Sequence, residues 1–219
     1  MERTDAGVKR SYNGTRRREQ AGRIRTDVLE AAHALLLEEG YAATSVARVA
    51  GQANVSVETI YKAFGNKPGL VRAVAERALE GTGTVPAETR SDALHTGKRD
   101  PRCVLRGWGA LAAEVAPRVA PILLLVRAGA AHDRDLAGLH DQLTEARHQR
   151  MAANAHRLAK GGHLRTDVDI AEATDVLWTY SSPELYELLV QRRGWNAERY
   201  GAFVAEAIIV HLLPRSAGS

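Results

Sequence analysis

The chain has little of several features on which whole classes of protein depend. Cys103 is its single cysteine among 219 residues, which excludes an intrachain disulfide framework and a cysteine-cluster zinc site and fits a reducing compartment. No apolar run approaches the roughly 18 residues that span a bilayer, and the N-terminus lacks the apolar segment of a signal peptide. We therefore expect a cytoplasmic protein without a membrane partner.

Motifs of known catalytic chemistry are also missing. The chain contains no H-E-x-x-H, no glycine-rich phosphate loop and no G-x-S-x-G, so we predict no catalytic residue, no cofactor and no metal. His132, Asp133, Asp135 and His140 superficially resemble metal ligands, but polar side chains at a helix start more often cap the helix. An all-helical enzyme remains an alternative, which would need acid and base groups that converge on a cavity.

Residues 44–67 have the pattern of two short helices joined by a tight turn. Residues 51–54 supply turn chemistry, Ser56 can cap the second helix, and Ile60 and Phe64 form its buried side. The side chains left pointing outward are Glu58, Thr59, Tyr61 and Lys62. An exposed tyrosine beside a lysine at a helix start suits contacts with phosphates and base edges. An ordinary helical hairpin is the alternative on pattern alone.

The order of residue types in this segment is distinctive enough to compare with known families. It runs through Thr44, Val46, Ala47, Val49, Ala50, Ala53, Val55, Ser56, Thr59, Ile60, Tyr61, Phe64, Lys67 and Leu70. This order closely resembles the N-terminal domain of the tetracycline-repressor (TetR) family of transcriptional regulators. The resemblance covers about residues 20–75, and a weaker similarity extends through residues 116–130 and 181–195. It implies a homodimer in which a fourth helix transmits ligand binding to the spacing of two DNA-reading heads.

Three positions depart from the family pattern. Asn54 stands where the family usually has glycine, and asparagine still tolerates a left-handed turn. Ala63 replaces a histidine or tyrosine and can donate no hydrogen bond to a phosphate. Pro68 disfavours helical angles at Lys67 and favours a fourth helix that begins at the proline.

The predicted DNA contacts divide into two groups. We expect Thr59 and Glu58 to read base edges. The residues expected to hold phosphates are Thr44, Arg48, Ser56, Tyr61, Lys62 and Lys67. Ser45 and Val57 complete the set on the two helices, and Arg16, Arg17 and Arg18 join it from the N-terminal segment.

The N-terminal segment carries most of the positive charge. Residues 1–25 contain eight basic and three acidic residues, a formal charge of +5 in a chain whose total is +4. Such an arm can follow phosphates or enter the minor groove. A solvated tail is the alternative for residues 3–10.

The helical patterning continues to the end of the chain without convincing strand alternation. We predict an all-α fold with an N-terminal three-helix helix-turn-helix domain and a larger helical domain for ligand binding and dimerisation. The predicted parts are a basic, flexible arm at 1–18, the helix-turn-helix domain at 19–67, a connecting helix at 68–81 and the larger domain at 82–215. Gly40 should stop the first helix. Pro117 and Pro121 should interrupt the helix that opens at residue 101.

The C-terminal domain offers candidates for two kinds of contact. A ligand pocket is usually lined by apolar residues with a few polar side chains. The predicted lining is Trp108, Leu124, Arg127, Trp178 and Tyr180. The last two helices are apolar over much of their circumference, which favours a dimer interface over an intrachain hairpin. The predicted interface residues are Leu177, Leu188, Phe203, Val204, Ala207, Ile208, His211 and Leu212.

Together these patterns predict a homodimeric regulator that binds a palindromic double-stranded DNA operator. A repressor released by an unidentified small-molecule effector is the favoured mechanism. An architectural DNA-binding protein without ligand control is the main alternative. Binding to random and specific duplexes would distinguish the two.

Overall fold

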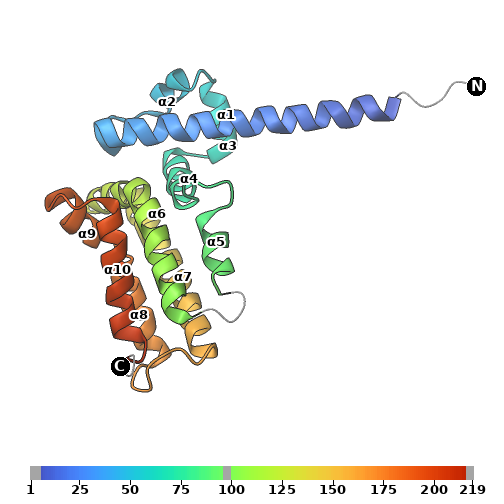
Figure 1. Cartoon of the computed structure of the whole chain (residues 1–219). Helices are drawn as coiled ribbons and strands as arrows, with labels where there is room; N and C mark the ends of the chain where they lie inside the picture. The colour runs from blue at the N-terminus through green and yellow to red at the C-terminus, as the bar shows by residue number, and fades with distance from the viewer. Residues whose placement is uncertain (1–5, 96–99, 216–219) are drawn as a thin grey trace, which may run out of the picture. The chain divides into compact units, whose positions relative to one another are not determined.

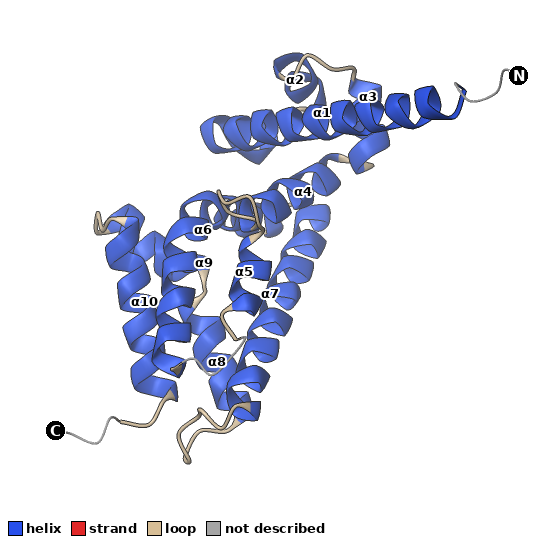
Figure 2. Cartoon of the chain, turned by 45° about the vertical axis from the view of Figure 1, so that its right-hand side comes forward, coloured by secondary structure: helices blue, strands red, loops and turns tan. Residues whose placement is uncertain are grey.

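The structure is a computed structural model that describes residues 6–95 and 100–215, with side chains from residue 16 onward except that of Arg17. The described chain is helical and contains no strand (Figure 2). It divides into two compact units, residues 1–74 and 75–219. The helices are α1 (Ala6–Ala43), α2 (Val46–Gln52), α3 (Val57–Phe64), α4 (Lys67–Leu79), α5 (Ala87–Ala93), α6 (Pro101–Ala130), α7 (Arg134–Lys160), α8 (Ile170–Tyr180), α9 (Pro183–Tyr186), the π-helix η1 (Glu187–Arg192) and α10 (Ala197–Leu212). The predicted all-α class is therefore confirmed.

The N-terminal unit is built on α1, against which the short helix α2 packs, and α3 packs in turn on α2 (Figure 1). One face of α1 is buried at helical spacing by Val28, Ala32, Leu35 and Leu36. At Gly40 the backbone leaves helical angles, with φ 77° and ψ 174°, where the sequence predicts the helix to stop. Glycine adopts this positive φ without the steric cost of a Cβ atom.

The N-terminal boundary differs from the prediction. Helix α1 begins at Ala6, so residues 6–18 continue the helix instead of forming a separate flexible arm. The segment contains no proline, and each residue added to an existing helix gains a backbone hydrogen bond without a new nucleation cost. Residues 1–5 of the predicted arm lie outside the described residues.

Helix α4 begins at Lys67, one residue before the predicted start at Pro68. It ends at Leu79, close to the predicted end of the connecting helix at residue 81. The division between the two compact units falls within α4, after Val74. The predicted helix-turn-helix domain ended earlier, at residue 67.

The C-terminal unit is a helical bundle centred on α6. Helix α6 packs most extensively on α10 and also contacts α7, α9 and α5, and α8 lies against α7 and α10 (Figure 1). The buried core between them includes Leu105, Trp108, Leu158, Leu177 and Tyr200. Helices α6, α7, α8 and α10 therefore bury apolar side chains against one another within the protomer.

Proline does not interrupt α6. Pro117 and Pro121 both lie inside this 30-residue helix, which corrects the prediction that they break it. A proline in a helix interior costs about 3 kcal/mol, and the burial of Val119, Ala120 and Ile122 around them offsets this cost. Tertiary packing here outweighs local backbone preference.

Two close contacts fix α6 within the bundle. Glu114 accepts two hydrogen bonds from Arg90, at 2.6 and 2.8 Å, and one from the backbone N–H of Thr82 at 2.7 Å. Farther along, a Cβ atom on Gly109 would lie 2.4 Å from the carbonyl oxygen of Gly201 on α10. Only glycine permits such an approach of two helix backbones.

Helix α6 is also, within the described part of the chain, the one helix that passes a test of length and apolar composition for a membrane span. The uninterrupted apolar runs of the sequence are too short to predict such a segment, because charged residues divide the apolar stretch of α6. Core helices of globular proteins pass the same test, and α6 has eight buried residues that include Leu105, Trp108 and Val126.

Candidate functional site

Two serine caps and one left-handed residue shape the segment from α2 to α3. The Ser45 hydroxyl accepts a hydrogen bond from the backbone N–H of Arg48 at 3.2 Å, and Ser56 accepts one from that of Thr59 at 3.1 Å. Between the helices Asn54 has φ 53°, a conformation that asparagine tolerates better than most residues. The two helices therefore begin at defined residues and are joined by a tight turn, as predicted.

Helix α3 is anchored by one side and presents the other. Ile60 is buried, with 1% of its surface exposed, whereas Val57 and Tyr61 are 38% and 49% exposed. Glu58, Thr59 and Lys62 are exposed as well. An apolar residue and an aromatic ring in solvent, beside polar groups and a cation, form a surface suited to base edges, thymine methyl groups and phosphates.

Thr44 corrects the predicted set of phosphate contacts. Its side chain is buried, at 3% exposure, and its hydroxyl lies 2.8 Å from the carbonyl oxygen of Gly40 and 3.1 Å from that of Leu35. This hydroxyl satisfies carbonyl groups at the end of α1 and cannot reach a phosphate.

Two predicted cations have partners within the protein. Arg48 is 57% exposed and forms an ion pair with Glu39 at 2.5 Å. The ammonium of Lys67 donates to the carbonyl oxygen of Tyr41 and lies 3.9 Å from the centre of that ring. An ammonium has three N–H donors, so a phosphate could bind Lys67 only beside these contacts.

Among the basic residues of α1, Arg25 has a contact with α3. Arg16 and Arg18 have exposed side chains, and the side chain of Arg17 lies outside the described residues. Arg25, which the sequence analysis counted only as a charge, places its guanidinium 4.6 Å from the centre of the Phe64 ring at the end of α3. Spacing along α1 cannot reveal this contact because Phe64 belongs to another helix.

A cavity of about 350 Å³ lies among α6, α7, α8 and α9. Its apolar wall includes Leu123, Val126 and Leu143. Its polar groups are His140, Thr144, Arg127, Arg147, Thr179, Ser182 and Glu184, and the ring of Trp178 completes the wall. A mostly apolar cavity with a few polar groups is the usual form of a small-molecule site.

Two of the five residues predicted for a ligand pocket, Arg127 and Trp178, line this cavity. The other three do not. Trp108 is in the core and packs on His95, with ring centres 5.2 Å apart, and Tyr180 packs on Phe203 at 6.3 Å. Leu124 is half-buried on α6 and is not part of the cavity lining. The predicted residues lie on α6 and α8, two of the four helices around the cavity, and only in part on the faces that line it.

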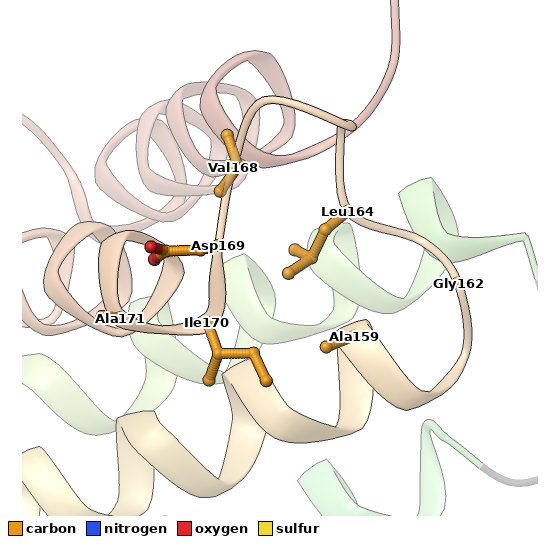
Figure 3. A pocket seen from close by; sticks show the side chains of 7 residues that line it. All are labelled: Ala159, Gly162, Leu164, Val168, Asp169, Ile170 and Ala171. Carbon is orange, nitrogen blue, oxygen red and sulfur yellow. The ribbon is translucent and has the colours of Figure 1, made fainter.

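A larger hollow of about 560 Å³ lies where the loop after α7 meets α8. Figure 3 shows Leu164, Ile170 and Ala159 around it. Its only carboxylate, that of Asp169, accepts a hydrogen bond from the backbone N–H of Glu172 at 2.8 Å and so caps α8. The hollow is open to solvent, and the one charged group in its lining already caps a helix.

The predicted dimer residues fall into two sets. Leu177, Val204, Ile208 and Leu212 are at most 4% exposed within the protomer, so the prediction that they lie at the interface is wrong for these four. Helix α10 packs on α6 and α8, and that contact buries its broad apolar side. The exposed or half-buried members are Leu188, Phe203, Ala207 and His211.

An exposed stripe nevertheless remains on α10. Phe203 is 39% exposed, and Val210, about two helical turns further on, is 66% exposed. His211 lies beside it, with a ring nitrogen 2.7 Å from the Ala207 carbonyl oxygen. We call Phe203, Val210 and His211 the α10 stripe. Val210 was not among the predicted interface residues, although it follows Phe203 by seven residues and so lies on the same face of the helix.

The polar residues before α7 act as a helix cap. The Asp133 carboxylate accepts hydrogen bonds from the backbone N–H groups of Asp135 and Leu136 at 2.8 and 3.0 Å. Within residues 6–95 and 100–215, no group of three or more histidine, cysteine or acidic residues is arranged to hold a metal ion.

Comparison with known proteins finds a family match for the N-terminal unit. Residues 28–74 match the family described as "Bacterial regulatory proteins, tetR family". An uncharacterized HTH-type transcriptional regulator of Bacillus subtilis, YvkB, is 39% identical over 74 residues, which cover 32% of this chain and 39% of the relative.

Solved structures extend the similarity in fold to the C-terminal unit. NalD of Pseudomonas aeruginosa, the secondary repressor of the MexAB-OprM multidrug efflux pump, is similar over 91% of this chain and 100% of its own, with TM-score 0.67 and 20% identity. A regulator from Saccharomonospora viridis in complex with choline is similar over 89% of this chain and 100% of its own, with TM-score 0.64 and 21% identity. Residues 28–74 are therefore similar to the TetR family of bacterial regulatory proteins, and the chain shares its fold with these solved regulators.

Proposed function

We propose that this chain is a transcriptional regulator that binds double-stranded DNA through α3. The observation that carries the proposal is the exposed side of α3, where Val57, Tyr61 and Lys62 project from a helix anchored by buried Ile60. Thr59 and Glu58 read base edges, and Lys62, Tyr61 and Ser56 hold phosphates. Arg16, Arg18 and Arg25 add positive charge to the same unit.

The protein acts as a homodimer that reads a palindromic operator. The α10 stripe supports this proposal because Phe203 and Val210 are large apolar side chains in solvent on a helix whose other side is buried. Two copies related by a two-fold axis place two α3 helices on half-sites about one helical turn, or roughly 34 Å, apart.

A small molecule in the cavity lined by Arg147 and Trp178 releases the dimer from DNA, so that the protein works as a repressor in the cytoplasm. The cavity's size and lining support an effector role, and a solved structure of the same fold contains choline. Release requires that the effector bind more tightly to the dimer whose α3 helices are wrongly spaced for the operator.

The decisive experiment selects bound sites from random duplex DNA with the full chain and then measures affinity for the selected site across a salt series. We expect a palindromic site, tight binding to it and much weaker binding to random DNA. Equal affinity for selected and random duplexes would favour an architectural role. Absence of binding to either duplex would refute the proposal.

Two variants separate phosphate contacts from base contacts. Lys62→Ala should weaken binding to all sequences alike and reduce the salt slope by about 1, whereas Thr59→Ala should alter preference at a defined base pair. Lys160→Ala is the matched control, because Lys160 is an exposed lysine at the end of α7 in the C-terminal unit. A Lys62→Ala variant with an unchanged salt slope contradicts the assigned role of Lys62.

A further inference from the structure

The charges that line the cavity among α6, α7, α8 and α9 are not balanced. Arg127 pairs with Glu184 at 2.6 Å and lies 3.9 Å from Glu187. Arg147 is the second cation of the lining, and the lining contains no other carboxylate than that of Glu184. The arginine and glutamate side chains of the lining therefore have a formal net charge of +1.

Arg147 is half-buried, and its hydrogen bonds and ring contact in the described structure are all to neutral groups. Its Nη1 donates to the carbonyl oxygen of Trp178 and to the Ser181 hydroxyl, the latter at 3.0 Å. Its guanidinium carbon lies 4.7 Å from the centre of the Trp178 ring. These contacts hold the group against one wall and make no use of its Nε and Nη2 donors.

Burial beside neutral partners makes this charge costly. Desolvation lowers the pKa of Arg147, and the nearby charge of Glu184 offsets this only in part, yet a guanidinium stays protonated at any physiological pH. A buried cation is stabilised when an anion replaces the water that it has lost. A cationic ligand would instead be repelled by Arg147, because the carboxylate of Glu184 is already paired with Arg127.

We propose that this cavity takes a small organic anion, a carboxylate with an apolar body, whose charge is held by Arg147. Leu123, Val126 and Leu143 contact the apolar body, and the carboxylate accepts hydrogen bonds from the unused guanidinium donors. The inference rests on the proposed function in one respect, that this cavity is the effector site.

A matched panel of compounds tests the charge preference directly. The probes are 2-naphthoate, 2-naphthamide and 2-naphthylmethylammonium, together with octanoate, octanamide and octylammonium. Dissociation constants are measured by titration calorimetry on the full chain. For at least one of the two bodies, the carboxylate should bind tenfold to a hundredfold more tightly than the amide, the range expected for a charged hydrogen bond. The ammonium compound should bind most weakly.

Substitutions on α7 test whether Arg147 causes the preference for carboxylates. In Arg147→Gln, carboxylate binding should fall to the level of the amide, while amide binding stays unchanged, and Arg147→Lys should restore part of the difference. Arg157→Gln is the control, because Arg157 lies on the same helix but pairs with Asp92 at 2.7 Å and does not line the cavity. Thermal denaturation shows whether each variant is folded. A folded Arg147→Lys keeps the test valid if Arg147→Gln does not fold.

Several results would overturn the inference. They are a preference for the ammonium or amide compounds, an undiminished carboxylate preference in a folded Arg147→Gln, and no binding by any of the six probes. Release of the selected DNA duplex is measured in parallel. If neutral or cationic compounds release the DNA and carboxylates do not, the ligand class is wrong and the proposed function stands. If the chain binds no DNA, the proposed function fails whatever the cavity binds.

Discussion

Replacement of Glu114 by glutamine tests how strongly the segment after α4 is attached to α6. The carboxylate accepts hydrogen bonds from Arg90 and from both the backbone N–H and the hydroxyl of Thr82, at distances between 2.6 and 3.1 Å. These contacts, with the bidentate Arg90 bond foremost, hold the pKa of Glu114 at about 2, against an ordinary 4.5. Glutamine keeps the shape of the side chain but loses the charge.

The magnitude follows from the pKa of Glu114 and its exposure. A change from 4.5 to about 2 corresponds to at most about 3 kcal/mol at neutral pH. The Arg90 and Glu114 side chains are 32% and 23% exposed, so solvent screens the pair and we expect about 1–2 kcal/mol. Because folding lowers this pKa, the contribution is complete above the ordinary value and disappears as the pH falls towards 2.

The assay is urea denaturation of the full chain, followed by circular dichroism at fixed protein concentration between pH 7 and pH 3. Glu114→Gln should lower the free energy of unfolding by about 1–2 kcal/mol at pH 7, and its difference from the parent should shrink at acid pH. Glu80→Gln is the control, since the Arg77 and Glu80 side chains are 35% and 48% exposed. An equal effect of the two substitutions, or a difference that does not change with pH, would refute this reasoning.

Three further predictions concern other parts of the chain. Ser56→Ala removes the cap of α3 and should cost about 1 kcal/mol in urea denaturation, whereas unchanged stability would show that the cap is dispensable. Gly201→Val should lower the melting temperature by several degrees, because its Cβ would lie 2.3 Å from the carbonyl oxygen of Gly109; Ala202→Val, at an exposed neighbour, should not. Val210→Asp should dissociate the dimer in sedimentation without unfolding the protomer, and an intact dimer would exclude the α10 stripe as its interface.

The sequence was sufficient for the α2–α3 segment because its signals are local. Ser56 precedes a helix whose Ile60 is buried, and Asn54 takes the left-handed conformation that the turn needs. Each of these features depends on residues within a few positions of one another. A single sequence can therefore predict them.

The parts that the sequence did not predict depend on contacts between distant residues. The polarity of Thr44 suggested a phosphate contact, but its hydroxyl reaches back to Leu35. The apolar face of α10 suggested a partner subunit, but α6 of the same chain covers most of it. In the sequence, Arg147 is one of many polar residues in its helix. Its charge becomes a candidate for ligand binding only in the folded chain, where its guanidinium packs on the Trp178 ring in the cavity wall.

The backbone contact between Gly109 and Gly201 has a mechanical consequence. Side chains between two helices normally act as a compliant layer that lets one helix slide or turn against the other, and α6 and α10 have no such layer where these two glycines meet. We therefore expect the two helices to move together as one rigid body within the protomer. Val126 on α6 lines the cavity, and Val210 on α10 faces solvent. Any displacement of the cavity wall on α6 must carry the outer surface of α10 with it.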